Sequence, residues 1–211
     1  MATRVKYPRT PHLPWSPGIG EDDILLDSLQ HLETLNVVVT EKLDGENTTL
    51  YRDYLHARSV DGASHVSRNW LKRFHAAIGY KISPDMRICG EYMFAQHSIF
   101  YDHLSSYFYV FAIFQNELCL SWDDTVAWCK NLALEPVPIL YRGPWNESQI
   151  RSCWRNVSYY GNEQEGYVVR NAAAFRFADF KSNVAKYVRA DHVRTTKHWQ
   201  RAAVVANQLA K

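Results

Sequence analysis

The sequence lacks any hydrophobic run long enough to cross a membrane, and its first residues lack the apolar core of a secretory signal peptide. Both absences favour a soluble, intracellular protein. We therefore expect a cytoplasmic protein that has no membrane partner.

Cysteine and histidine patterns typical of metal sites are also missing. The four cysteines form no C-x-x-C motif, and the nine histidines form no H-x-x-x-H motif. The sequence therefore predicts neither a zinc site nor a disulfide framework. The cysteines are instead expected to pack as small apolar side chains, and they are Cys89, Cys119, Cys129 and Cys153.

The chain contains enough apolar residues for one compact domain over 1–211. Of its 211 residues, 46% are hydrophobic and 14% are aromatic, which favours a globular rather than a disordered or fibrous protein. Residues 1–20 form a Pro-rich N-terminal arm, in which prolines at every third position disfavour regular structure. We expect this arm to be extended.

Charge is distributed unevenly along the sequence. From Arg170 to Lys211, nine basic residues face two acidic ones, although the whole chain carries a formal net charge of only +2. Residues 191–211 are predicted to form a basic C-terminal helix. Such a basic end suits a phosphate-rich partner, but it is equally typical of a solvated surface.

Hydrophobic patterning predicts short strands mixed irregularly with helices. The expected strands include 37–40, 47–50, 55–59, 86–94, 107–114 and 166–170. Helices are expected over 22–35, over 67–79 with Ser67 as the N-cap, from Ser121 onward, and over 147–155. Because hairpins dominate, this order predicts an α+β domain with antiparallel β-sheets flanked by helices.

The most informative stretch is Lys42-Leu43-Asp44-Gly45, which follows a β-branched strand. A lysine at the end of a strand, before a turn closed by glycine, can point its amine into a cleft. Taken alone, this pattern also fits an ordinary surface lysine.

Five further segments follow Lys42 along the chain, and they are Ala57-Arg58-Ser59, Cys89-Gly90-Glu91-Tyr92, residues 109–113, residues 165–170 and a lysine-containing segment within residues 180–188. With these segments in this order, the sequence resembles the ATP-dependent RNA ligase family, within the larger group of DNA ligases and mRNA capping enzymes. Ala57-Arg58-Ser59 resembles the arginine motif of the family, and Cys89-Gly90-Glu91-Tyr92 resembles its first glutamate motif. Residues 109–113 resemble the aromatic strand of the family, and residues 165–170 resemble its second glutamate motif. The final lysine motif of the family is expected within residues 180–188. The resemblance implies a nucleotidyltransferase (ligase adenylation) fold.

The resemblance implies that Lys42 attacks ATP and carries AMP covalently. A free lysine has a pKa of about 10.4, so its pKa must fall before the amine can attack phosphorus. In the family pattern, Lys181 or Lys186 and a Mg²⁺ or Mn²⁺ ion provide the positive charge that lowers it. Many relatives carry two lysines two positions apart in this motif, but here Asp179 precedes Lys181 and Val184 precedes Lys186.

The same resemblance assigns the remaining site residues. Glu91 and Glu165 are expected to contact the ribose or the metal ion through its water shell. Arg58 suits a ribose or phosphate contact, and Phe111 suits stacking on adenine, although Tyr109 on the same strand and a plain core role for Phe111 stay open. Two further contacts are expected, with adenine from Glu41 and with the reacting strand ends from Asn47.

The expected substrates are RNA ends that carry a 5′-phosphate and a 3′-hydroxyl, as in RNA repair. Only 21 residues follow position 190, too few for the C-terminal oligonucleotide-binding (OB) barrel of DNA ligases and capping enzymes. Arg9 and His12 of the arm are expected to help the basic end contact the strand. Two alternatives stay open: a minimal DNA ligase that acts on DNA or mixed strands, and a nucleic-acid-binding module without catalysis.

Overall fold

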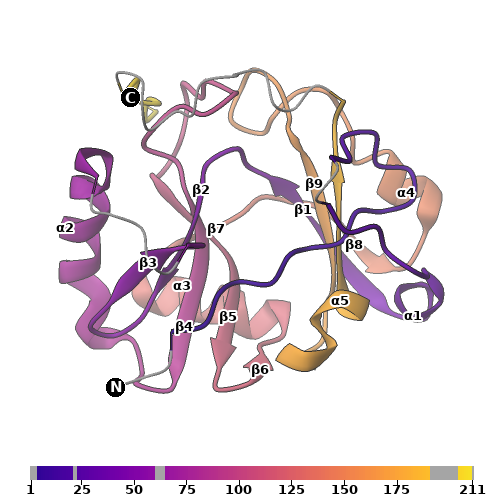
Figure 1. Ribbon diagram of the computed structural model, residues 1–211, viewed down its shortest axis with the longest axis horizontal. Coiled ribbons are helices and arrows are strands. Elements are labelled where there is room, and N and C mark those ends of the chain that lie inside the picture. The colour runs from indigo at the N-terminus through magenta and orange to yellow at the C-terminus, as the bar shows by residue number, and fades with distance from the viewer. Residues whose placement is uncertain (1–3, 21–22, 60–64, 191–203, 211) are drawn as a thin grey trace.

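The structure, a computed structural model, describes residues 4–20, 23–59, 65–190 and 204–210, and two β-sheets form its centre (Figure 1). The smaller sheet has the strand order β11–β9–β1–β8, and its strands pair antiparallel. Their bounds are Asn36–Lys42 for β1, Ile139–Pro144 for β8, Gly166–Asn171 for β9 and Val184–Val188 for β11.

The larger sheet has the order β10–β6–β5–β4–β2–β3, with β7 pairing parallel to β5. Its other pairings are antiparallel, which confirms the predicted α+β class. No separate oligonucleotide-binding barrel occurs among the described residues. The bounds are Glu46–Leu50 for β2, Leu55–Ala57 for β3, Met86–Tyr92 for β4, Phe108–Gln115 for β5, Leu118–Cys119 for β6, Glu135–Pro136 for β7 and Phe175–Arg176 for β10.

Helices cover the outer faces of both sheets. Helices α2 and α3 pack on the larger sheet, and α1, α4 and the N-terminal arm pack on the smaller one (Figure 1). The α-helices span Gln30–Glu33 for α1, Asn69–Ile78 for α2, Trp122–Leu132 for α3, Glu147–Arg151 for α4 and Phe180–Asn183 for α5. Short 3-10 helices span Val66–Arg68 for η1, Gly79–Lys81 for η2 and Phe177–Asp179 for η3.

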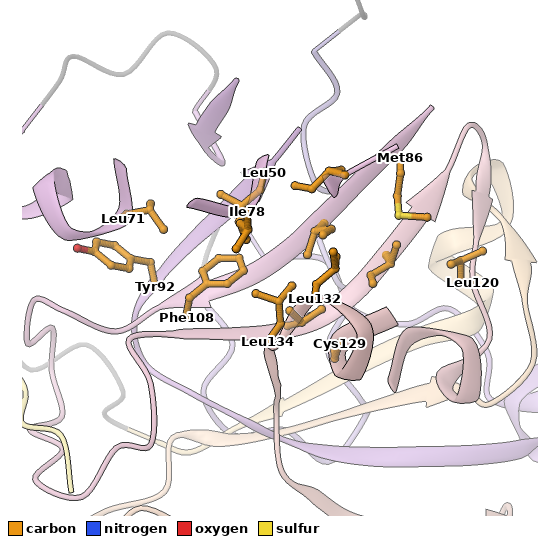
Figure 2. Close-up of a cluster of buried hydrophobic side chains, with 14 residues drawn as sticks. Leu50, Leu71, Ile78, Met86, Tyr92, Phe108, Leu120, Cys129, Leu132 and Leu134 are labelled. Carbon is orange, nitrogen blue, oxygen red and sulfur yellow. The ribbon is translucent and has the colours of Figure 1, made fainter. Parts of the chain in front are cut away.

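The hydrophobic core under α2 and α3 fixes the larger sheet. Leu71 and Ile78 of α2 meet Leu50 of β2 and Phe108 of β5 in one buried cluster (Figure 2). The spacing of seven residues places Leu71 and Ile78 on the same helix face. Trp70 and Phe74 of the same helix are partly buried against this cluster.

Strand β1 alternates in a way that delivers its last residues to the space between the sheets. Val37 and Val39 are buried with the outer cluster, whereas Val38 is buried between the sheets. Because side chains of a strand alternate with a period of two, Thr40 and Lys42 share the face of Val38.

Helix α3 begins where the sequence predicted. The Ser121 side chain accepts a hydrogen bond from the backbone N–H of Asp124 at 3.1 Å, which makes Ser121 the N-cap. Asp123 and Asp124 lie in the first turn, where carboxylates interact favourably with the positive end of the helix dipole.

The arm is extended, as predicted, and it is fixed to the smaller sheet. His12 forms a parallel bridge with Lys186 of β11 and another with Leu25. These contacts also explain why the helix predicted over 22–35 is wrong for most of its length. Residues 24 and 26 pair with the backbone of His12, so only the last turn remains helical as α1.

Two other helix boundaries differ from the prediction. Ser67 is not the N-cap of α2, because it lies within η1, whose own N-cap is His65. The predicted helix over 147–155 ends at Arg151, because the backbone N–H of Arg155 donates to the Gln164 side chain instead of continuing the helix.

The predicted basic helix over 191–211 lies largely outside the described residues. Its described part, residues 204–210, is extended instead of helical. Ala206 bridges Ala95, Leu209 bridges Leu104, and the buried Asn207 side chain accepts from the Tyr101 N–H and donates to the Met93 carbonyl. Contacts with distant backbone thus override the local helical preference. Within the described part of the chain, no helix is long and apolar enough to cross a membrane.

Replacing Leu71 by alanine should lower the free energy of unfolding by about 2–5 kcal/mol, because the fully buried side chain leaves a cavity against the larger sheet. The matched control is Leu118→Ala, whose side chain is 42% exposed and should cost less than about 0.5 kcal/mol. Urea denaturation followed by circular dichroism measures both values. Equal losses in the two variants would contradict this assignment of the core.

Candidate functional site

A cavity of about 970 Å³ opens between the two sheets. Side chains from β1, β2, β4, β5, β9 and β11 line it, together with the arm. Seven of the nine predicted site residues lie in its wall: Glu41, Lys42, Asn47, Arg58, Glu91, Phe111 and Lys186.

Lys42 is the last residue of β1, and its amine faces the predicted second glutamate. Lys42 Nζ donates a hydrogen bond to Glu165 Oε2 at 2.5 Å, and the Glu165 side chain is only 7% exposed. Glu165 lies next to Lys42 because the following residue, Gly166 of β9, pairs with Lys42 of β1. A Cβ on Gly166 would lie 2.0 Å from the Tyr187 carbonyl oxygen, so this close strand approach requires glycine.

The carboxylates around Lys42 determine the direction in which its pKa is shifted. Burial by itself lowers the pKa of the Lys42 ammonium, but the carboxylates of Glu165 and Glu91 outweigh burial and raise it. The protein's own groups therefore favour the protonated amine, and the lowering of its pKa that the sequence predicts depends on the positive charge of the metal ion.

Glu91 reaches the cavity from β4 and accepts a hydrogen bond from the Gly45 N–H at 3.2 Å. Burial, with a contribution from the negative charge of Glu165, raises the pKa of the Glu91 carboxyl to about 8, although Lys42 opposes the shift. Gly45 is needed for this contact, because a Cβ there would lie 2.6 Å from both the Met93 sulfur and the Tyr92 carbonyl oxygen.

Glu165 is perturbed in the same direction. Burial raises the pKa of the Glu165 carboxyl to about 7, although the nearby Lys42 ammonium acts against the shift. Two carboxyls and one ammonium thus share a site with little solvent, so that each charge depends on the other two.

Asp44, the acidic residue of the turn after Lys42, has a structural role, because its hydrogen bonds hold that turn in place. Its Oδ2 accepts hydrogen bonds from the N–H groups of Ser98 and Ile99, at 2.7 and 2.8 Å. Its own N–H donates to the Tyr101 hydroxyl at 3.1 Å. These bonds hold the turn in the orientation that points Lys42 inward.

The structure decides between the two aromatic candidates of β5. Phe111 lines the cavity, whereas Tyr109 is fully buried elsewhere and its hydroxyl accepts N–H bonds from Ser105 and Ser106. A β-bulge opposite the step from Cys89 to Gly90 leaves Phe111 as the extra residue in β5. Because of this extra residue, the alternation of β5 side chains between the two faces of the sheet shifts at Phe111.

The two candidate lysines lie in different places. Lys186, on β11, lines the cavity, and its amine donates to Asp23 at 3.1 Å. Burial and the positive charge of Lys42 lower the pKa of Lys186, although Asp23 opposes them. Lys181 is exposed and lines a second hollow beside the cavity.

His12 does not lie where a strand contact was expected. Its side chain is fully buried, with Nδ1 at 2.8 Å from the Ser16 hydroxyl oxygen and Nε2 at 3.2 Å from an Asp23 oxygen. That expectation is therefore wrong for His12, because the arm is packed into the smaller sheet, although Arg9 of the same arm is exposed.

Sequence reasoning missed an ion pair in the cavity wall. Arg68 of η1 donates to Glu46 Oε1 of β2 at 2.6 Å, and the two side chains are 8% and 11% exposed. Both residues line the cavity. Neither belongs to a motif, and the two are separated by 22 residues, so no local signal connects them.

Carboxylate oxygens at the cavity suit a hard divalent cation such as Mg²⁺. Within the described ranges, no group of three or more His, Cys, Asp or Glu side chains is positioned to hold a metal ion. A cation near Glu91 and Glu165 would therefore contact them through its water shell, which is one of the two contacts that the sequence predicts for these glutamates.

Comparison with known proteins places this geometry in a family. The sequence model of the RNA ligase family matches residues 35–188, which include the Lys42 turn, both glutamates and Lys186. The chain belongs to the RNA ligase family. No curated protein sequence matches it.

Solved structures of ligases share the fold of this RNA ligase family member. An archaeal ATP-dependent RNA ligase has a TM-score of 0.60 at 17% identity, over 87% of this chain and 48% of that one. A mutant RNA ligase of Naegleria gruberi, solved with ATP and manganese, has a TM-score of 0.56 at 16% identity, over 87% and 58%.

A putative ATP-dependent DNA ligase of Aquifex aeolicus is similar to the same degree. Its TM-score is 0.56 at 19% identity, over 87% of this chain and 50% of that one. The chain thus spans about half the length of these ligases. At such low identity the similarity establishes the nucleotidyltransferase fold that the sequence implied.

The free energy of unfolding should fall as pH rises from about 5 to about 8, because the folded carboxyls of Glu91 and Glu165 keep protons that the unfolded chain has released. Carboxyls with a raised pKa in the folded state stabilise it least above that pKa. Glu91→Gln should therefore flatten the pH profile, as measured by urea denaturation across the range. Glu117→Gln, at an exposed loop position, is the control and should keep the wild-type slope. A wild-type slope in Glu91→Gln would contradict the site electrostatics.

Proposed function

We propose that this chain is an ATP-dependent RNA ligase that forms a covalent lysyl–AMP intermediate on Lys42. The observation that carries the proposal is the position of Lys42. Its amine lies at the cavity between the sheets, hydrogen-bonded to Glu165 and flanked by Glu91 and Lys186. A lysine with only a structural role would not need two carboxyls with raised pKa around it.

The proposed reaction has three steps. Lys42 Nζ attacks the α-phosphorus of ATP, the bond to pyrophosphate breaks and a P–N bond forms. An oxygen of the strand's 5′-phosphate then attacks that phosphorus, the P–N bond breaks and the AMP moves to the strand. Finally a 3′-hydroxyl attacks the 5′-phosphorus and releases AMP, which seals the strand.

Removal of a proton from Lys42 is the demanding part of the first step. Glu165 Oε2 already accepts the Lys42 hydrogen bond, so this carboxyl is placed to take the proton once added positive charge lowers the lysine pKa. A divalent ion bound with ATP supplies positive charge that lowers the lysine pKa and offsets charge on the phosphates. The Naegleria gruberi structure, solved with ATP and manganese, supports this pairing of ligands.

Other cavity residues suit recognition of the nucleotide. Phe111 offers a ring for stacking on adenine, and Arg58 lies at the mouth, within reach of ribose or phosphate. Glu41 is 2% exposed, and its Oε1 accepts no hydrogen bond from the described residues, so it suits an amino donor such as that of adenine. Lys186 is proposed to contact the phosphates, because among the two candidate lysines it is the one that lines the cavity.

Asn47 is proposed to help position the reacting strand ends. It lies in the cavity wall two residues after Gly45, and its Oδ1 is buried without a hydrogen-bond partner in the described part of the chain. An acceptor left unsatisfied at a binding cavity favours a ligand that donates, such as a ribose hydroxyl.

Incubation with α-labelled ATP and Mg²⁺ should label the wild-type protein, while Lys42→Ala should take up no label because the nucleophile is absent. Lys130→Ala removes an exposed lysine of α3 outside the cavity and serves as the matched control that keeps labelling. Equal labelling of wild type and Lys42→Ala, or labelling of neither, would show the proposal to be wrong.

Substrate choice is tested with matched nicked strands of RNA, DNA and mixed composition. The family match favours RNA, so RNA with a 5′-phosphate and a 3′-hydroxyl should be sealed fastest and should accumulate an adenylated strand when the 3′-hydroxyl is removed. Preferential sealing of DNA would instead support the minimal DNA ligase, for which the Aquifex aeolicus similarity is the supporting observation. Salt-sensitive RNA binding without any adenylate would support a binding module.

A further inference from the structure

A second hollow, of about 880 Å³, adjoins the cavity. It lies between the N-terminal arm, the end of β3 and the segment of η3 and α5. The hollow and the cavity adjoin along residues that line both, and two of these, Arg58 and Ser59, are exposed. The shared residues are Tyr7, Pro8, Arg58, Ser59 and Phe180.

Positive charge dominates the hollow. Lys6, Arg9, Arg58 and Lys181 line it, and no aspartate or glutamate does. Lys6, Arg58 and Lys181 form no ion pair with any residue that the structure describes. All four basic side chains are exposed. The charges of Lys6, Arg58 and Lys181, which no carboxylate pairs, attract anions to this concave surface, and phosphates most effectively.

The wall between hollow and cavity is built from aromatic rings. The Tyr7 ring packs edge-on against Phe111 with centroids 4.9 Å apart, and against Phe180 with centroids 5.2 Å apart. Tyr7 lies between Lys6 and Arg9 in the arm. The position of these two basic residues is therefore fixed relative to Phe111, the proposed adenine contact, which pre-organises the hollow for a ligand that enters the same mouth.

We propose that this hollow binds the phosphate backbone of the RNA strand whose 5′-phosphate enters the cavity. The inference rests on the proposed function. ATP extends no further than its γ-phosphate, and the ammonium groups of Lys42 and Lys186 already provide positive charge for it in the cavity. A strand continues out through the mouth, so its next phosphates need cations on the outside. The hollow provides these cations where the strand emerges, and it gives Lys181 a role outside the nucleotide site.

The decisive experiment measures binding of a 5′-phosphorylated single-stranded RNA at several salt concentrations. The Lys6→Ala/Lys181→Ala double variant should bind more weakly, and the slope of log affinity against log salt should shrink by about 1.4, since each lost phosphate contact contributes about 0.7. Lys81→Ala/Lys130→Ala removes the same charge from exposed residues that line neither the hollow nor the cavity, and it should bind as wild type.

A second arm separates the strand from the triphosphate tail of ATP. Self-labelling with α-labelled ATP, in the absence of RNA, should proceed at the wild-type rate in the double variant and should be slowed by Lys186→Ala. If the double variant instead shows a raised KM for ATP with unchanged RNA binding, the hollow holds the triphosphate and the proposal is overturned. Unchanged RNA affinity and salt slope would overturn it as well.

The proposed ligase function and the proposed strand-binding hollow can be disproved independently of each other. If the wild-type protein forms no lysyl–AMP, the proposed function is wrong. RNA binding by the double variant and its control still decides whether the hollow receives strand phosphates, because that measurement requires no adenylate.

Discussion

The ion pair between Lys42 and Glu165 is the constraint on which the rest of the structure depends. Removing charges from water costs several kcal/mol per ion, so this pair, in which the Lys42 side chain is 26% exposed and the Glu165 side chain 7%, persists only where geometry and further hydrogen bonds are favourable. The close approach at Gly166, the turn held by Asp44 and the contact from Gly45 to Glu91 all serve that geometry. The pair itself lies within the smaller sheet, where β1 and β9 are neighbours, and the contact from Gly45 to Glu91 brings β4 of the larger sheet to the same cavity.

Under the proposed mechanism, this arrangement links chemistry to substrate binding. Glu91 and Glu165 raise the pKa of Lys42 in the protein alone, so the amine stays protonated until positive charge arrives with the nucleotide. The N-terminal arm takes part in this arrangement, because it pairs with β11 at Lys186 and leads to Asp23, which holds the amine of Lys186. The arm therefore helps to build the cavity and is not an appendage to it.

Local sequence patterns predict much of the fold, and the places where those predictions are wrong have physical reasons. The β-branched run of β1 and the Ser121 cap of α3 lie where the sequence predicts them. The helix over 22–35 is largely replaced by pairing with the arm, and residues 204–210 are extended because Asn207 satisfies backbone groups of distant segments. In both places long-range hydrogen bonds outweigh propensities that amount to a few tenths of a kcal/mol per residue.

The sequence alone determined the α+β class and the family, because ordered motifs from Lys42 to Lys186 are local signals that survive without coordinates. Only the tertiary structure decided which lysine lines the cavity, which aromatic residue of β5 faces it, and that Arg68 pairs with Glu46 in its wall. These features depend on a bulge, on strand pairing and on contacts across many residues. A linear pattern does not encode such contacts, because the partner of each side chain is set by packing between the sheets.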